Sequence, residues 1–351
     1  MMDFLTQWKT FSLALAPSGR EAAMADCLRQ ALAPHCDDIR TDKLGNLIAK
    51  IAPEKPTHRV MLTAPMDECG FMIRNIDNDG RLRLTLLGAY DTRVLSGRRV
   101  VTLSGAHGIV SAKPIHVLSA DERSKPTPSD RIYVELGAKD KAEAETLTHL
   151  GDFGTWEPKF TALKNDFYAG KALGARGACV VLCEAAAQLA EMKRAGKLQA
   201  EFDLVFSAKR RIGGRFAAVE TAAFTLCPDV VLVIDAAAAA DFDKAKETER
   251  GCACGAGAVI APADVKTIYD RALYADATAL AAANGIAWQT PGTAAGAGNE
   301  AGVLHKSGAG ARTLSLGIPT RNLNSGAEIV KKQDVEAALA LLSAWIKKEN
   351  G

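Results

Sequence analysis

Two consecutive arginines, Arg210 and Arg211, stand where a folded sheet usually carries its chemistry. They follow the apolar run L-V-F at residues 204–206, which predicts a strand, in the segment F-S-A-K-R-R-I-G-G. Open α/β sheets bind their ligands beyond the carboxyl ends of strands. Guanidinium groups bind carboxylates through two parallel hydrogen bonds, and two adjacent cations repel metal ions. The pair therefore indicates an ion-paired or anion-binding cleft, with solvated surface charges as the alternative interpretation.

Alternating strand and helix patterns surround these arginines. Such alternation predicts an α/β domain with a mixed sheet flanked by helices. The alanine run at 236–240 is interpreted as a loop or a helix start. The expected strands lie at 46–51, 59–64, 203–207, 230–235 and 258–261, and the expected helices at 177–194, 215–225, 263–284 and 334–347.

Between the halves of this domain, the character of the chain changes. Short alternating runs separated by turn residues predict a small all-β unit with one short helix at 141–148. Its expected strands lie at 71–76, 81–87, 99–103, 108–113 and 131–136. We therefore divide the chain into a discontinuous α/β domain, residues 1–66 and 162–351, and an inserted β domain, residues 67–161. The insertion is too small to bury all its apolar surface, which predicts that it mediates oligomerisation.

Composition excludes several classes of function. The chain has 43 basic and 41 acidic residues, and a net charge of +2 gives no footprint for nucleic acid or an anionic membrane. No leader is recognised at the start, and no run approaches the ~18 apolar residues of a membrane span. The eight cysteines lie mostly in apolar runs. We expect a cytoplasmic protein with reduced thiols, and no structural zinc at Cys252 and Cys254.

Several motifs in register then resemble one known family. They are A-P-S-G-R-E, T-D-K-L-G-N-L-I-A, P-M-D-E-C-G-F-M-I, G-A-Y-D-T-R-V-L-S-G-R-R-V, G-K-A-L-G-A-R-G-A and I-P-T-R-N-L-N-S, which span nearly the whole chain. The sequence is similar to the glutamyl-aminopeptidase and tetrahedral aminopeptidase family of metallopeptidases. That resemblance implies two co-catalytic zinc or cobalt ions and self-assembly into dimers or dodecamers. Paired metals in such sites polarise a carbonyl and activate a water molecule.

At most of the positions where the resemblance implies metal ligands, this sequence has no suitable side chain. One ligand of five is kept, Asp235, and Arg210 stands in the position of the general base. Asp67 and Arg176 are kept from the motifs beside the ligands. Carboxylate and imidazole are the groups that bind zinc or cobalt tightly, so we expect no metal cofactor here. The five implied ligand positions are Pro65, Gly174, Arg211, Asp235 and Asn324.

The sequence therefore predicts an oligomeric pseudopeptidase, without hydrolytic activity, that binds a peptide or a small anion in its former cleft. The expected pocket residues are Asp67, Arg176, Arg210, Arg211, Asp235 and Asn324. At least one of the paired arginines should bind Asp67 or Asp235, because these carboxylates need counter-charge without metals. Two alternatives stay open: an active aminopeptidase with an altered metal site, and a scaffold subunit that joins active paralogues in mixed oligomers.

Overall fold

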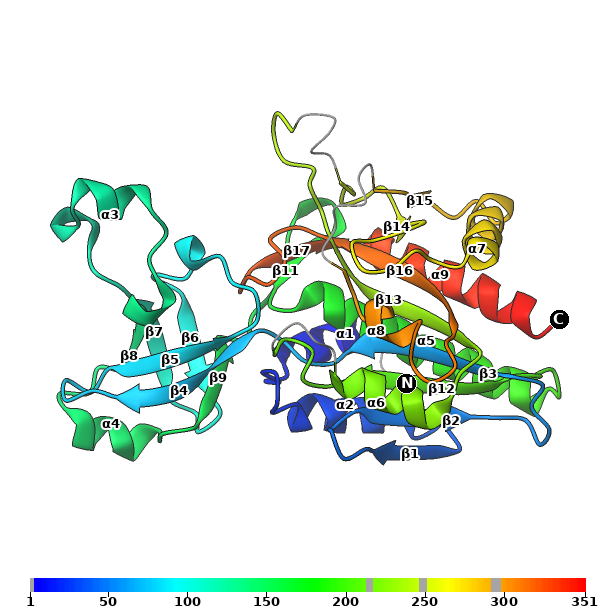
Figure 1. Cartoon of the computed structure of the whole chain (residues 1–351), viewed down its shortest axis with the longest axis horizontal. Coiled ribbons are helices and arrows are strands. Elements are labelled where there is room, and N and C mark those ends of the chain that lie inside the picture. The colour runs from blue at the N-terminus through cyan, green and yellow to red at the C-terminus, as the bar shows by residue number, and fades with distance from the viewer. Residues whose placement is uncertain (1–2, 213–216, 246–250, 292–297) are drawn as a thin grey trace.

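The computed structural model describes residues 3–212, 217–245, 251–291 and 298–351 of the chain. A larger α/β part and a smaller barrel lie side by side (Figure 1). The barrel is connected through the segments that enter β4 and leave β9, at the left of the view.

The α/β part is organised by one mixed sheet. Its four central strands are parallel, whereas β1, β2 and β14 pair antiparallel with their inner neighbours. The central strands are apolar runs buried on both faces, as parallel strands usually are. Within the described residues the order is β1 (Asp38–Thr41), β2 (Leu47–Ile51), β12 (Glu201–Ser207), β3 (Arg59–Pro65), β13 (Val230–Ala238), β16 (Arg312–Thr320), β14 (Ala258–Ile260) and β15 (Trp288–Gln289).

Helices flank this sheet. The long helix α5 (Leu173–Arg194) packs on β3, β13 and β16 and against α9 and α1. Its length and hydropathy would suit a membrane span, but 83% of the relevant window is buried inside the protein. The other helices are α1 (Phe4–Leu13), α2 (Ala22–Leu32), α6 (Ala217–Leu226), α7 (Arg271–Ala283), α8 (Ala301–Leu304) and α9 (Lys332–Glu349).

A short sheet lies beside α5. It consists of β10 (Phe160–Ala162), β11 (Phe167–Gly170) and β17 (Glu328–Lys331), and its strands pair antiparallel. Strand β17 brings Glu328 to the first turn of α5, where this carboxylate accepts a hydrogen bond from the backbone of Gly174.

The smaller part is a closed barrel with its own apolar core. Its strands, in spatial order, are β4 (Gly70–Ile76), β5 (Leu82–Leu87), β8 (Tyr133–Glu135), β7 (His107–Ser111), β6 (Arg99–Thr102) and β9 (Phe153–Trp156). Phe71, Leu84, Val134 and Trp156 are among the side chains that fill it. The helices α3 (Ala120–Ser124) and α4 (Lys141–Leu147) lie outside the strands (Figure 1). Single 3₁₀ turns lie at η1 (Thr92–Val94), η2 (Ile115–Val117), η3 (Ser129–Arg131) and η4 (Lys164–Asp166).

Two sequence predictions about elements are wrong, and one central strand was not predicted. The expected helix at 263–284 begins only at Arg271, because the Asp264 side chain accepts hydrogen bonds from the backbone of Lys266 and Thr267 and folds the segment into a turn. The alanine run at 236–240 continues β13 as far as Ala238, which pairs with Thr320. Strand β16 was not expected. The first residues of the helix expected at 215–225 lie outside the described part of the chain.

Candidate functional site

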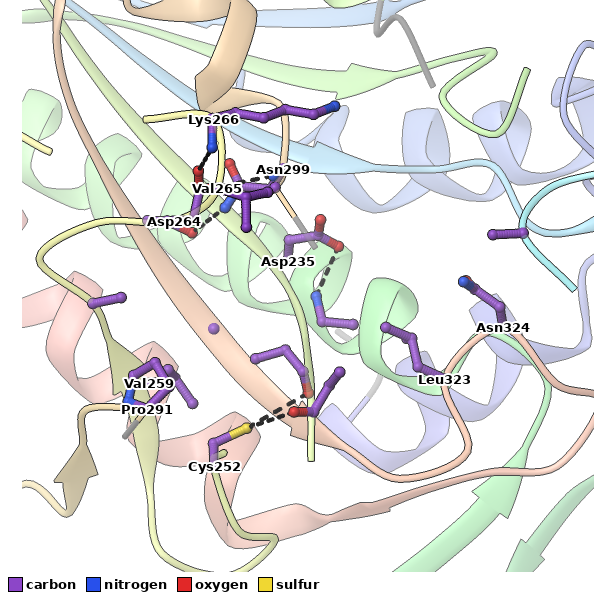
Figure 2. A pocket seen from close by; sticks show the side chains of 18 of the residues that line it. Asp235, Cys252, Val259, Asp264, Val265, Lys266, Pro291, Asn299, Leu323 and Asn324 are labelled. Atoms are coloured by element: carbon purple, nitrogen blue, oxygen red, sulfur yellow. Dashed lines mark hydrogen bonds between the residues drawn. The ribbon is translucent and has the colours of Figure 1, made fainter. Parts of the chain in front are cut away.

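The carboxyl ends of the parallel strands converge on a cavity of about 650 Å³. Arg210, Arg211, Asp235 and Asn324 all line it, and Asp235 and Asn324 are labelled in Figure 2. They come from three segments near that edge: the turn after β12 carries both arginines, β13 carries Asp235, and the turn after β16 carries Asn324. The structure thus brings together four of the six pocket residues expected from the sequence. The other two, Asp67 and Arg176, are fully buried and do not line the cavity.

The turn that carries the two arginines is held by side chains from outside β12. The backbone N–H of Lys209, at φ +54°, donates to Glu21 at 2.8 Å. The N–H of Arg211 donates to Asp67 at 2.9 Å and to the Ser18 hydroxyl at 3.3 Å. A shift of this turn by one residue would break all three hydrogen bonds. The backbone conformation of the turn therefore helps to orient the two arginine side chains toward the cavity.

Arg210 binds the carboxylate at the end of β13. Its Nη2 donates to Oδ2 of Asp235, while Oδ1 accepts from the N–H of Ala236 at 2.7 Å. Its Nε lies 3.9 Å from Glu300, a fully buried carboxylate. The expected arginine–aspartate contact is present.

Glu300 is a second carboxylate next to Arg210. It accepts hydrogen bonds from the hydroxyls of Ser207 and Thr63. Burial raises the pKa of Glu300 to about 7, with Asp235 acting in the same direction, although Arg210 and the two hydroxyls oppose the shift. A proton on Glu300 therefore relieves an excess of negative charge next to the Arg210–Asp235 pair.

Arg211 joins a second carboxylate to the turn after β16. Its Nη1 donates to Oδ1 of Asn324, and its Nε lies 3.6 Å from Asp67. Asn324 adopts φ +66°, and its N–H donates to Glu328 at 3.0 Å. Burial raises the pKa of Glu328 to about 7, while the charge of Arg211 acts against the shift. Arg211 and Glu328 thus fix Asn324 from its two ends.

The implied metal ligands do not fit a metal. Pro65 offers no ligand atom, and a Cβ on Gly174 would lie 2.3 Å from Thr320 Oγ1 and 2.5 Å from Ala236 Cβ. Neighbouring groups thus occupy the space that a carboxylate at position 174 would need. Over the described ranges, no group of three or more His, Cys, Asp or Glu side chains could hold a metal ion.

A buried ion pair lies next to Arg176, whose Nη2 is 3.8 Å from Glu68. Lys171 Nζ donates to both oxygens of Glu68 at 2.8 Å and to the Ala14 carbonyl at 2.6 Å. Burial lowers the pKa of Lys171 to about 8, with the Arg176 charge acting in the same direction. Arg176 donates to the Met66 carbonyl from α5. Arg176 is therefore a supporting residue and does not line the cavity.

Sequence reasoning missed Glu300, Glu328 and Lys171. Glu328 lies in A-E-I-V-K, whose β-branched residues Ile329 and Val330 could have predicted β17. Glu300 follows a glycine-rich stretch and offers no comparable signal.

Comparison with known proteins identifies close structural counterparts. A family model described as M42 glutamyl aminopeptidase matches residues 45–341. The chain is 30% identical over 318 residues to the lysyl aminopeptidase of Pyrococcus furiosus, covering 89% of this chain and 87% of the relative. It is 28% identical over 338 residues to the putative aminopeptidase FrvX of Escherichia coli, with 95% and 92% covered.

Solved structures give the same result. The TET aminopeptidase from a marine sediment thaumarchaeote superposes with a TM-score of 0.91 at 28% identity, over 98% of this chain and 96% of that one. The Pyrococcus horikoshii TET1 peptidase, which can assemble into a tetrahedron or a large octahedral shell, has a TM-score of 0.83 at 26% identity, over 98% and 99%.

The lack of space for a side chain at Gly174 leads to a stability prediction. Gly174→Ala should lower the free energy of unfolding by about 1–3 kcal/mol, because Thr320 and Ala236 must move. Gly174→Asp should cost more, since it adds a buried charge. Gly177→Ala in the same helix is the control: its Cβ would lie 3.3 Å or more from its neighbours. Urea unfolding measures all three, and equal stabilities for the position 174 and 177 variants would contradict the prediction.

Glu300 should make stability depend on pH. The folded protein keeps the Glu300 proton up to about pH 7, whereas its ordinary pKa is 4.5. This contribution to stability is therefore complete below pH 4.5 and is lost as the pH rises through 7. Glu300→Gln should gain stability relative to the parent between pH 5 and pH 8, by up to about 3 kcal/mol. Thermal unfolding across this range measures the gain, with the exposed change Glu191→Gln as control, and a difference that stays constant with pH would refute the assignment.

Proposed function

The chain belongs to the M42 glutamyl aminopeptidase family, and we propose that it is a member that binds a ligand in its cleft without hydrolysing peptides. One observation carries the proposal: Arg210 and Arg211, at the positions that the family resemblance gives to a general base and a metal ligand, bind Asp235 and Asn324. A guanidinium group accepts no proton at neutral pH and repels a divalent cation. This arrangement therefore provides no general base and disfavours the binding of two metal ions.

The charges of the site support the same conclusion. Asp235 and Asp67 each lie against an arginine. In a hydrolase of this class, metal ions would neutralise such carboxylates. The paired arginines supply that positive charge here, so the fold needs no metal for its stability. We further propose that the protein acts in the cytoplasm, which is supported by eight cysteines that are all free thiols.

Metal content and hydrolysis test this proposal directly. The purified protein should contain much less than one equivalent of zinc, cobalt or manganese by elemental analysis. Hydrolysis of aminoacyl-p-nitroanilides, with zinc or cobalt added, should fall at least about 10²–10⁴-fold below that of the Pyrococcus furiosus relative assayed in parallel, since the general base is replaced. Stoichiometric metal with comparable hydrolysis would instead establish an active enzyme with an altered site. Co-purification with an active homologue would favour the scaffold alternative.

Self-assembly is the second part of the proposal. The TET relatives assemble into large shells, and the barrel exposes apolar side chains at η2, with Ile115 72% and Val117 52% exposed. Two exposed apolar side chains on one short turn are suited to a contact between copies of the chain. We propose that the barrel joins copies of this chain.

Sedimentation velocity at micromolar concentration should therefore show at least a dimer of the 37.1 kDa chain. The double change Ile115→Lys and Val117→Lys should shift the distribution toward the monomer, because it places charges in an apolar contact. Ile268→Lys, at an 88% exposed position in the α/β part, is the control and should leave assembly unchanged. A parent protein that sediments as a monomer would disprove the oligomer.

A further inference from the structure

The acidic side chains that line the cavity are already satisfied by donors from the protein. Asp235 accepts from Arg210 and from the N–H of Ala236. Asp264 accepts from the backbone N–H groups of Lys266 and Thr267 at 2.7 and 2.8 Å and from the Tyr269 hydroxyl at 2.7 Å. Figure 2 draws its contact with Lys266. Neither carboxylate therefore offers a strong acceptor to a cationic ligand.

Donors, by contrast, remain available at the end of the cavity near β16. Because Oδ1 of Asn324 accepts from Arg211 Nη1, the amide orientation is fixed and its Nδ2 points away from the arginine. Within the described chain, no acceptor is found for Nδ2 of Asn324 or for Nη2 of Arg211. Both residues line the cavity. Together they place two N–H donors, one of them charged, at one end of the cavity.

The wall next to these donors is apolar. Ala236, Ala237 and Ala238 of β13, Val259 and Leu323 form it. Gly317 also lines the cavity and leaves no room for a side chain, since a Cβ there would lie 2.8 Å from Ala237 and 2.9 Å from Val259. An apolar wall beside a small number of fixed donors is typical of a site for an amphipathic small molecule.

We propose that this cavity binds a singly charged carboxylate that carries a short apolar group, with the carboxylate on Arg211 Nη2 and Asn324 Nδ2. The apolar group lies along Ala236–Ala238 and Leu323. A single negative charge fits better than a dianion, because Asp67 already lies 3.6 Å from the Arg211 guanidinium and offsets part of its charge. The inference rests on the proposed function and specifies the ligand class of the same cleft.

Calorimetry in metal-free buffer containing EDTA tests the proposal with matched probes. N-acetyl-L-leucine should bind, and its neutral isostere N-acetyl-L-leucinamide should bind at least about tenfold more weakly, since the charge-assisted hydrogen bonds are lost. The cation L-leucinamide, acetate and inorganic phosphate should bind more weakly still. The peptide Ala-Ala-Leu distinguishes the source of the carboxylate, because it binds as well as N-acetyl-L-leucine only if the cavity accepts a peptide C-terminus.

Two variants locate the site. Asn324→Asp keeps a side chain that tolerates positive φ and can still bind Arg211, but it removes the amide donor and adds a negative charge. It should reduce N-acetyl-L-leucine affinity at least about tenfold. Asn322→Asp is the matched control, at an exposed position with φ +52°, and should leave affinity unchanged. Ala238→Phe, at an exposed position of the apolar wall, should weaken binding at least about tenfold by occupying the space beside the donors, which keeps the test valid if Asn324→Asp does not fold.

Equal affinity for the acid and its amide, tighter binding of L-leucinamide, or no binding of N-acetyl-L-leucine at millimolar concentration would each overturn the proposal. Unchanged affinity in the folded Asn324→Asp variant would do so as well. These outcomes are independent of the test for hydrolysis, because EDTA removes any metal from the binding experiment. A protein that hydrolyses anilides with zinc refutes the proposed function, whereas one that neither hydrolyses nor binds carboxylates refutes only the ligand class.

Discussion

The contact between the Arg210 guanidinium and the Asp235 carboxylate is the interaction on which the cleft depends. Asp235, Asp67, Glu300 and Glu328 are all buried around the ends of the central strands. Carboxylates brought together without cations repel one another and resist ionisation. Arg210 and Arg211 offset this repulsion, and both lie on one turn of the chain. The conformation of that turn, which a hydrogen bond from the N–H of Arg211 to Asp67 holds, therefore determines whether the buried carboxylates are neutralised.

The fold could be predicted from sequence where burial and pattern agree. Strands β3, β12 and β13 each contain an apolar run, the pattern of central parallel strands, and their positions were predicted closely. Strand β16 was missed because R-T-L-S-L-G-I-P-T contains a glycine and a proline, which usually interrupt strands. Gly317 is required there by the close approach of Ala237 and Val259, and that requirement is a tertiary one that the local sequence does not reveal.

The candidate site was predictable only in part, for a similar reason. Motif positions placed the two arginines, Asp67 and Asp235 near one sheet edge, and their opposite charges predicted that at least one arginine binds one of these carboxylates. Arg210 binds Asp235. The raised pKa values of Glu300 and Glu328 come from burial by segments far apart in the sequence, so no local pattern could signal them. The role of Asn324 was likewise hidden, because its value as a donor depends on Arg211 fixing the orientation of its amide.

Gly174 constrains which side chains the first turn of α5 can carry. An aspartate at this position would drive its side chain into Thr320 and Ala236, and it would add a negative charge beside buried carboxylates. Thr320 lies on β16 and Ala236 on β13, so a larger residue at position 174 requires compensating changes in two strands of the sheet. Substitutions at these three positions are therefore expected to be energetically coupled, with the effect of each depending on the residues at the other two.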